Sequence, residues 1–171
     1  SLSLFVLLSE GGGRAARGPT PDQTPVFRTM TTRMSAAEIE AYLDQVFPQL
    51  HYGGRTYFVE EVGPLFARMR CDYHEKHLRP GGTISGPTMM ALADLALYVA
   101  ILAQIGPVAL AVTTSLNYNF LRKPGQAALI GEAKLLKLGK RLAVGEVCLY
   151  SQGESEMVCH ATGTYSIPSE R

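Results

Sequence analysis

The apolar run at residues 87–105 constrains this chain more than any other feature, because Asp94 carries its only charged side chain. A helix that is apolar on all sides is buried, either in a protein core or in a bilayer. The run is close to the ~20 residues that a bilayer requires, but a charged residue at the centre of a span costs about 3 kcal/mol. Basic anchors are also missing from both ends of the run. We therefore predict a helix in the core of a domain and no membrane span.

Alternating apolar and polar residues surround this run and predict β-strands. Two strand candidates precede the run and four follow it, at residues 57–62, 65–71, 111–121, 127–138, 141–152 and 156–167. Short breaks that contain Gly, Pro and Lys separate the last four candidates, as is typical of an antiparallel meander. We expect an α+β fold, in which an antiparallel six-stranded sheet wraps around one long buried helix.

The N-terminal part of the chain divides at Ser35. Ser35 and Glu38 form a capping box, and apolar residues then recur at helical spacing up to Pro48, which predicts a short N-terminal helix. Residues 1–34 are rich in Gly, Pro, Thr and Arg and have no such periodicity. We expect them to be a flexible leader, or the result of a misplaced start site, ahead of a domain at residues 35–171.

Composition narrows the possible partners. The chain has 171 residues, which suits one domain, and its formal charge of +1 gives no whole-surface field to hold nucleic acid. Its three cysteines form no CxxC pair, so we predict neither a disulfide framework nor a zinc site, and we expect a reducing cytoplasm. Metal-ligand residue types do gather at residues 71–77, but without the order or spacing of a known metal motif, so we predict no metal.

Ser85, Gly86 and Pro87 have the composition of a helix start, with Gly86 suited to the cap and Pro87 to the first helical position. The first N–H groups of a helix have no partner within it, and the helix dipole adds positive potential there. Such a start can stabilise the oxyanion that develops when an acyl carbonyl is attacked. Glycine at this point would let a substrate approach the backbone.

Asp94 loses hydration among its apolar neighbours, so it needs a partner, a polar cavity or a catalytic task. It lies seven residues after Pro87, or about 10 Å along the helix axis. Asp94 therefore cannot easily reach a carbonyl held at Gly86 of the same chain. If both residues act on one bond, we expect the base, Asp94, to come from a second subunit, which predicts a site at a dimer interface.

Three segments, in this order, resemble hotdog-fold thioesterases of the phenylacetate-pathway (PaaI-like) group. Residues 82–94 resemble the G-x-x-H-G-G-x-x-x-x-L-A-D segment of that group, with Ser85 in place of His. Residues 113–122 resemble its T-V-D-L-N-I-N-F-L-R strand, and residues 139–143 resemble its G-x-R-L-A hairpin. The resemblance extends over about residues 35–167 and implies a hotdog fold with thioesterase activity.

The resemblance implies hydrolysis of acyl-CoA thioesters, with a medium-chain or aryl acyl group, by a homodimer or a dimer of dimers. Asp94 matches the residue that attacks the substrate or activates water, and Gly86 matches the glycine whose N–H polarises the thioester carbonyl. Thr113 falls where the group often has a hydroxyl that orients water or the carboxylate. Ser85 stands where the group usually has His, Pro87 where it has the second Gly, and Arg79 where many members have Asn or Gln. We expect Ser85 and Arg79 to contact the substrate. Coenzyme A is part of the substrate, so no separate cofactor is implied.

Several further residues are candidates for substrate binding. We expect two basic turns, around Arg122 and around Lys140 and Arg141, to meet at one edge of the sheet and bind the phosphates of CoA. The alternative is that they are ordinary solvated charges. Met89 and Met90 either line an adaptable acyl pocket or pack in the core.

Two other functions fit the same fold. One is a non-catalytic acyl-CoA-binding or regulatory protein, which the replacement of the usual His by Ser85 would favour. The other is a hydratase or dehydratase, which would need a dyad containing His, and no His is found near Asp94 in the sequence.

Overall fold

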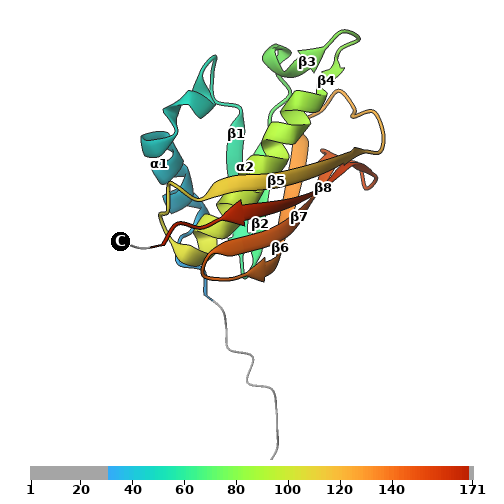
Figure 1. The fold of residues 1–171 in the computed structure, drawn as a ribbon. Coiled ribbons are helices and arrows are strands. Elements are labelled where there is room, and N and C mark those ends of the chain that lie inside the picture. Colours follow the sequence, from blue (N-terminus) through green and yellow to red (C-terminus); the bar gives the residue numbers. More distant parts are fainter. Residues whose placement is uncertain (1–30, 170–171) are drawn as a thin grey trace, which may run out of the picture.

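Helix α2 (Gly86–Ile105) forms from the apolar run and is the centre of the domain (Figure 1). The computed structural model describes residues 31–169. By length and hydropathy α2 could cross a membrane, but most of it is buried inside the domain. Its buried side chains include Leu92, Leu97 and Ile101, each at most 1% exposed. The predicted core helix is therefore confirmed.

A six-stranded antiparallel sheet curves around α2, as predicted, and this arrangement is the hotdog fold (Figure 1). Its order is β1-β2-β6-β7-β8-β5. The strands are β1 (Tyr57–Gly63), β2 (Phe66–Cys71), β5 (Val112–Phe120), β6 (Leu129–Leu138), β7 (Leu142–Ser151) and β8 (Met157–Ser166).

The expectation that the last four strands form a meander is correct only for β6, β7 and β8. Strand β5 pairs with β8 and lies at the edge of the sheet, while β6 pairs with β2. The connection at residues 121–128 is long enough for this crossing, since it can extend to about 26 Å and the three strand spacings it passes add up to about 14 Å. Strand β5 therefore keeps one edge free of any partner among residues 31–169.

Two glycines let α2 lie close to the sheet. Gly145 on β7 and Gly163 on β8 are direct cross-strand partners. A Cβ atom added at Gly145 would lie 2.6 Å from Leu97 Cδ2, and one added at Gly163 would lie 2.7 Å from Leu97 Cδ1. Leu97 therefore packs directly on the strand backbones, which brings α2 against the inner face of β7 and β8.

The N-terminal helix α1 (Ala36–Val46) starts with the predicted capping box between Ser35 and Glu38. A 3₁₀ turn, η1 (Pro48–His51), follows it. Residues 1–30 of the expected leader lie outside the described residues. Arg33 and Met34 contact the domain, since the Arg33 N–H donates to Ala103 O at 2.7 Å and Met34 is 9% exposed.

Short elements occupy the polar segment ahead of α2: the 3₁₀ turn η2 (Glu75–His77) and a hairpin of β3 (Leu78–Arg79) and β4 (Thr83–Ile84). The His77 ring is buried and anchors this segment. The ring Nε2 lies 2.8 Å from Thr56 Oγ1, and the ring Nδ1 lies 3.4 Å from Thr88 Oγ1. The backbone carbonyl of His77 accepts the Ser85 N–H at 2.8 Å. His77, in η2, thus connects the residue just before β1 to the start of α2.

We expect the stability of the domain to fall as the pH drops below about 6.5, partly through His77. Burial, with Lys76 and His74 nearby, lowers the pKa of His77 below its usual 6.5. The unfolded chain then binds a proton that the folded chain resists, so acidification favours unfolding. Melting temperatures of the wild type and His77→Gln between about pH 7.5 and 5.5 test this, because Gln keeps polar contacts without titrating. Equal slopes in both proteins would contradict it.

Candidate active site

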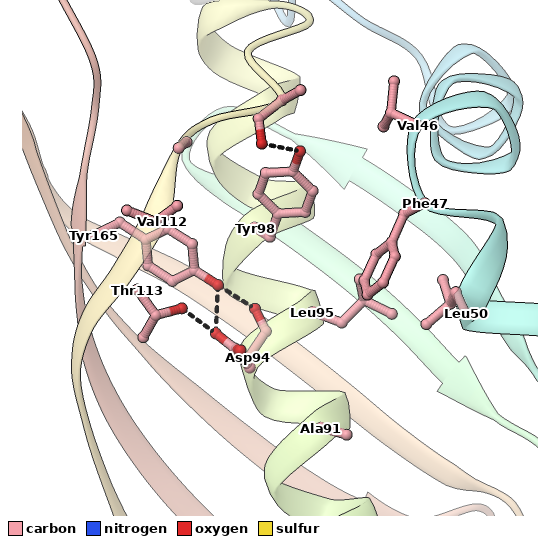
Figure 2. Close-up of a pocket in the computed structure, with 12 residues that line it drawn as sticks. Val46, Phe47, Leu50, Ala91, Asp94, Leu95, Tyr98, Val112, Thr113 and Tyr165 are labelled. Carbon is pink, nitrogen blue, oxygen red and sulfur yellow. Dashed lines mark hydrogen bonds between the residues drawn. The ribbon is translucent and has the colours of Figure 1, made fainter.

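Asp94 is half-buried on α2, and its carboxylate is held by two hydroxyl groups (Figure 2). Thr113 Oγ1, at the start of β5, donates to Asp94 Oδ1 at 2.6 Å. The Tyr165 hydroxyl, on β8, donates to the same oxygen and also lies 2.8 Å from the Asp94 carbonyl oxygen. The structure therefore brings Asp94 and Thr113 together and adds Tyr165.

Tyr165 is only 4% exposed. Burial, and then the charge of Asp94, raise the pKa of its phenol, so Tyr165 stays protonated and acts as a donor. Sequence reasoning missed this residue. The available signal was a polar aromatic side chain on the apolar face of the last strand, two residues after Gly163 and two before Ile167.

A pocket of about 450 Å³ opens beside Asp94. One wall comes from α1 and η1, whose side chains face α2 across the cavity (Figure 2). Tyr98, one helical turn beyond Asp94, stacks on Tyr165 with ring centres 6.4 Å apart. The lining is mainly apolar and consists of Val46, Phe47, Leu50, Ala91, Asp94, Leu95, Tyr98, Ala109, Ala111, Val112, Thr113 and Tyr165.

The methionines proposed as an acyl pocket are not part of this lining. Met89 is buried in the core at 5% exposed and also reaches a second pocket. Met90 is 39% exposed, and its carbonyl accepts from the Tyr118 hydroxyl at 3.3 Å. The contribution of α1 and η1 to the cavity had no signal in the sequence, because it depends on how α1 packs.

The start of α2 differs from the prediction by one position. Ser85, rather than Gly86, is the N-cap: its Oγ accepts the Thr88 N–H at 3.3 Å and lies 3.0 Å from Thr88 Oγ1. A serine oxygen can accept the N3 amide, which Gly cannot do, and this decides the cap. Gly86 is the first helical residue, and none of residues 31–169 accepts its N–H. That donor is free for a ligand.

A second pocket, of about 440 Å³, has Gly86 in its lining and shares no lining residue with the pocket beside Asp94. Phe120, at the end of β5, closes one side, at 3.7 Å from the Cβ position of Gly86. Arg79, Arg122 and Lys123 also line it. Arg122 is partly neutralised, since its Nη1 donates to Glu156 at 2.6 Å.

Lys140 and Arg141 do not join this basic group. They lie in the β6–β7 turn beside Ile105, at the far end of α2, in a pocket of about 870 Å³. The expectation that the two basic turns share one edge is therefore wrong within one chain. The β6–β7 turn and the end of β5 are at opposite ends of α2, a helix about 30 Å long.

The residues considered for a metal site have other partners. The Cys71 thiol donates to Asp72 O at 3.8 Å, and His74 Nδ1 accepts the Lys76 N–H at 3.1 Å. The His77 ring forms hydrogen bonds with Thr56 and Thr88. Within residues 31–169, no three His, Cys, Asp or Glu side chains lie close enough to hold a metal ion.

Comparisons with known proteins identify the family and the fold of this chain. A family model described as the thioesterase superfamily matches residues 81–158. A candidate thioesterase from Silicibacter sp., known from a crystal structure, has 44% sequence identity to this chain and a TM-score of 0.75. The match covers 82% of this chain and 96% of that one. A candidate esterase from Saccharolobus solfataricus is 29% identical over 65% of this chain and 73% of its own length.

A mutant of the phenylacetic acid degradation protein PaaI from Thermus thermophilus is also similar. It is 28% identical to this chain, with a TM-score of 0.60, over 71% of this chain and 99% of that one. The segments that carry the sequence resemblance therefore lie in a fold that this group shares.

Proposed function

Because the chain belongs to the thioesterase superfamily of hotdog-fold proteins, we propose that it hydrolyses an acyl-CoA thioester to a free acid and CoA. The observation that carries this proposal is the Asp94 carboxylate, which Thr113 and Tyr165 hold at the wall of an apolar pocket. A thioester carbonyl is already electrophilic and its thiolate leaves readily. One carboxylate and one backbone donor can therefore suffice.

In the proposed reaction, the thioester carbonyl oxygen accepts the free N–H of Gly86. Asp94 takes a proton from water while the water oxygen attacks the carbonyl carbon, and the Gly86 N–H stabilises the oxyanion. The C–S bond then breaks, and the thiolate of CoA leaves with the proton that Asp94 took from water. Direct attack by Asp94 is the other route: the carboxylate oxygen bonds to the acyl carbon as the C–S bond breaks and the thiolate of CoA leaves, and water then hydrolyses the resulting anhydride to the free acid and Asp94.

We propose that Asp94 and Gly86 meet across a dimer formed by β5. Within the part of the chain that the structure describes, one edge of this strand has no partner, and the strand carries exposed apolar residues at both ends, with Val112 53% and Phe120 50% exposed. An antiparallel pair of β5 strands centred on Leu116 would place Val112 opposite Phe120 of the partner subunit. Thr113 contacts Asp94 and Phe120 lies beside Gly86. This pairing would therefore join the Asp94 pocket of one chain to the Gly86 pocket of the other.

In this proposed arrangement, each part of the substrate has its own binding region. The acyl group, either medium-chain or aryl, would occupy the apolar pocket between α1 and α2. The CoA phosphates would lie toward the basic residues around Gly86 in the partner subunit, namely Arg79, Arg122 and Lys123. Lys140 and Arg141 fall outside this path and remain candidates for the distal end of the nucleotide. A dimer of dimers and a cytoplasmic location complete the proposal, and the free thiols of the three cysteines suit a reducing compartment.

Filling the pocket from the α1 side should change acyl selectivity. Val46 is 39% exposed on α1 and lines the pocket, so we expect Val46→Trp to reduce kcat/KM for octanoyl-CoA and benzoyl-CoA by about 10-fold or more relative to acetyl-CoA. Gln45→Trp, on the same helix but outside the lining, is the matched control. A uniform loss with all three substrates would contradict this assignment of the pocket.

Release of free thiol from short, medium, long and aryl acyl-CoAs tests the function directly. Hydrolysis of one group well above the uncatalysed rate supports the proposal. Tight binding without turnover would indicate an acyl-CoA-binding protein instead, an outcome that the use of Ser85 as a helix cap would help to explain. Loss of an enoyl-CoA chromophore without thiol release would indicate a hydratase.

A further inference from the structure

Tyr165 and Thr113 are direct cross-strand partners between β8 and β5. Side chains at paired positions of an antiparallel sheet point to the same face, and here both hydroxyls reach one carboxylate oxygen, Oδ1 of Asp94. We propose that Tyr165 is a positioning residue, which together with Thr113 selects the carboxylate oxygen that reacts. This inference rests on the proposed hydrolase function and adds a residue to it.

The two carboxylate oxygens of Asp94, Oδ1 and Oδ2, differ in how many hydrogen bonds they accept. A carboxylate oxygen has two lone pairs in its plane, so two donors occupy Oδ1. Among residues 31–169, no side chain or backbone N–H donates to Oδ2. Oδ2 is therefore the oxygen available to take a proton from water or to attack the thioester.

The single proton of the Tyr165 hydroxyl goes to the carboxylate. Both Oδ1 and the Asp94 carbonyl oxygen lie within hydrogen-bonding distance. The carbonyl oxygen already accepts a helix hydrogen bond at this position in α2. A charged acceptor also binds a donor more strongly than a neutral one does. The contact thus fixes the carboxylate and leaves the helix intact.

Tyr165 can hold this position because its own surroundings are rigid. Strand β8 pairs with β5 on one side and with β7 on the other, where Tyr165 faces Ala143. Its ring is buried and stacks on Tyr98. A donor fixed in this way limits rotation of the carboxylate, and a small misplacement of a catalytic group is costly to the rate.

The test is Tyr165→Phe, which keeps the ring in the pocket wall and removes only the hydroxyl. We expect kcat to fall by about 10- to 100-fold, the range for losing a hydrogen bond to a charged group, with KM within about twofold of the wild type. Tyr57→Phe is the matched control. Tyr57 is also a buried tyrosine, 8% exposed, but it lies on β1, and its loss should leave kcat unchanged.

Two further variants keep the inference falsifiable if Tyr165→Phe folds poorly. Thr113→Val removes the other donor to Oδ1 and should show the same loss in kcat at constant KM, while Thr113→Ser keeps a hydroxyl and should restore activity. A Tyr165→Phe protein with wild-type melting temperature and wild-type kcat would overturn the role of Tyr165. An unaffected Asp94→Asn enzyme would instead overturn the proposed function itself.

Discussion

Replacing Asp94 with Asn is expected to lower kcat for acyl-CoA hydrolysis by about 10³-fold, with the fold unchanged. Asn has nearly the same shape as Asp, and its amide oxygen can still accept from Thr113 and Tyr165. It can neither take a proton from water nor attack a thioester. The loss should therefore appear in kcat while binding of the acyl-CoA persists.

Thiol release measures this loss, and equilibrium binding of the intact acyl-CoA to the inactive variant measures what remains. Asp72→Asn is a matched control, since Asp72 is an acidic residue of the same type that lies just after β2 and outside the pocket. Circular dichroism and the melting temperature verify that both variants fold. Hydrolysis at the wild-type rate in Asp94→Asn would refute the mechanism.

Local patterns were enough to predict most elements of the fold. The run at residues 87–105 predicted a buried core helix, and the alternation after it predicted four strands to within about two residues at each end. The place of β5 was not predictable in this way. Its pairing with β8 depends on a crossing by residues 121–128. The turn residues between the strands are equally compatible with a meander, in which β5 would pair with β6.

The candidate site likewise has residues that the sequence predicts and residues that only the tertiary structure reveals. Asp94 stood out as the single carboxylate of an apolar run, and the resemblance implied the role of Thr113. Tyr165 became visible only with the β5–β8 register, which places it opposite Thr113. The wall from α1 and η1 depends on tertiary packing. The separation of Arg122 from Lys140 follows from the sheet order, which residue spacing does not encode.

A hybrid dimer should show that each site uses two chains. We expect Asp94→Asn and Gly86→Pro homodimers to be inactive. A hybrid of the two, isolated with two different affinity tags, should recover about half of the wild-type rate per dimer. In that hybrid one site combines both defects, while the other pairs an intact Asp94 with an intact Gly86 of the partner subunit. Proline removes the N–H of residue 86 and is favoured at the start of a helix.

The matched control places both substitutions in one chain and pairs it with a wild-type chain. If the site spans two subunits, each site then carries one defect and this hybrid is inactive. If each chain holds a complete site, the wild-type chain keeps about half of the activity, and the first hybrid has none. The two hybrids contain the same residues in different combinations, so loss of stability affects them alike. Which of the two hybrids is active therefore depends only on whether the Asp94 and Gly86 of one site belong to the same chain or to different chains.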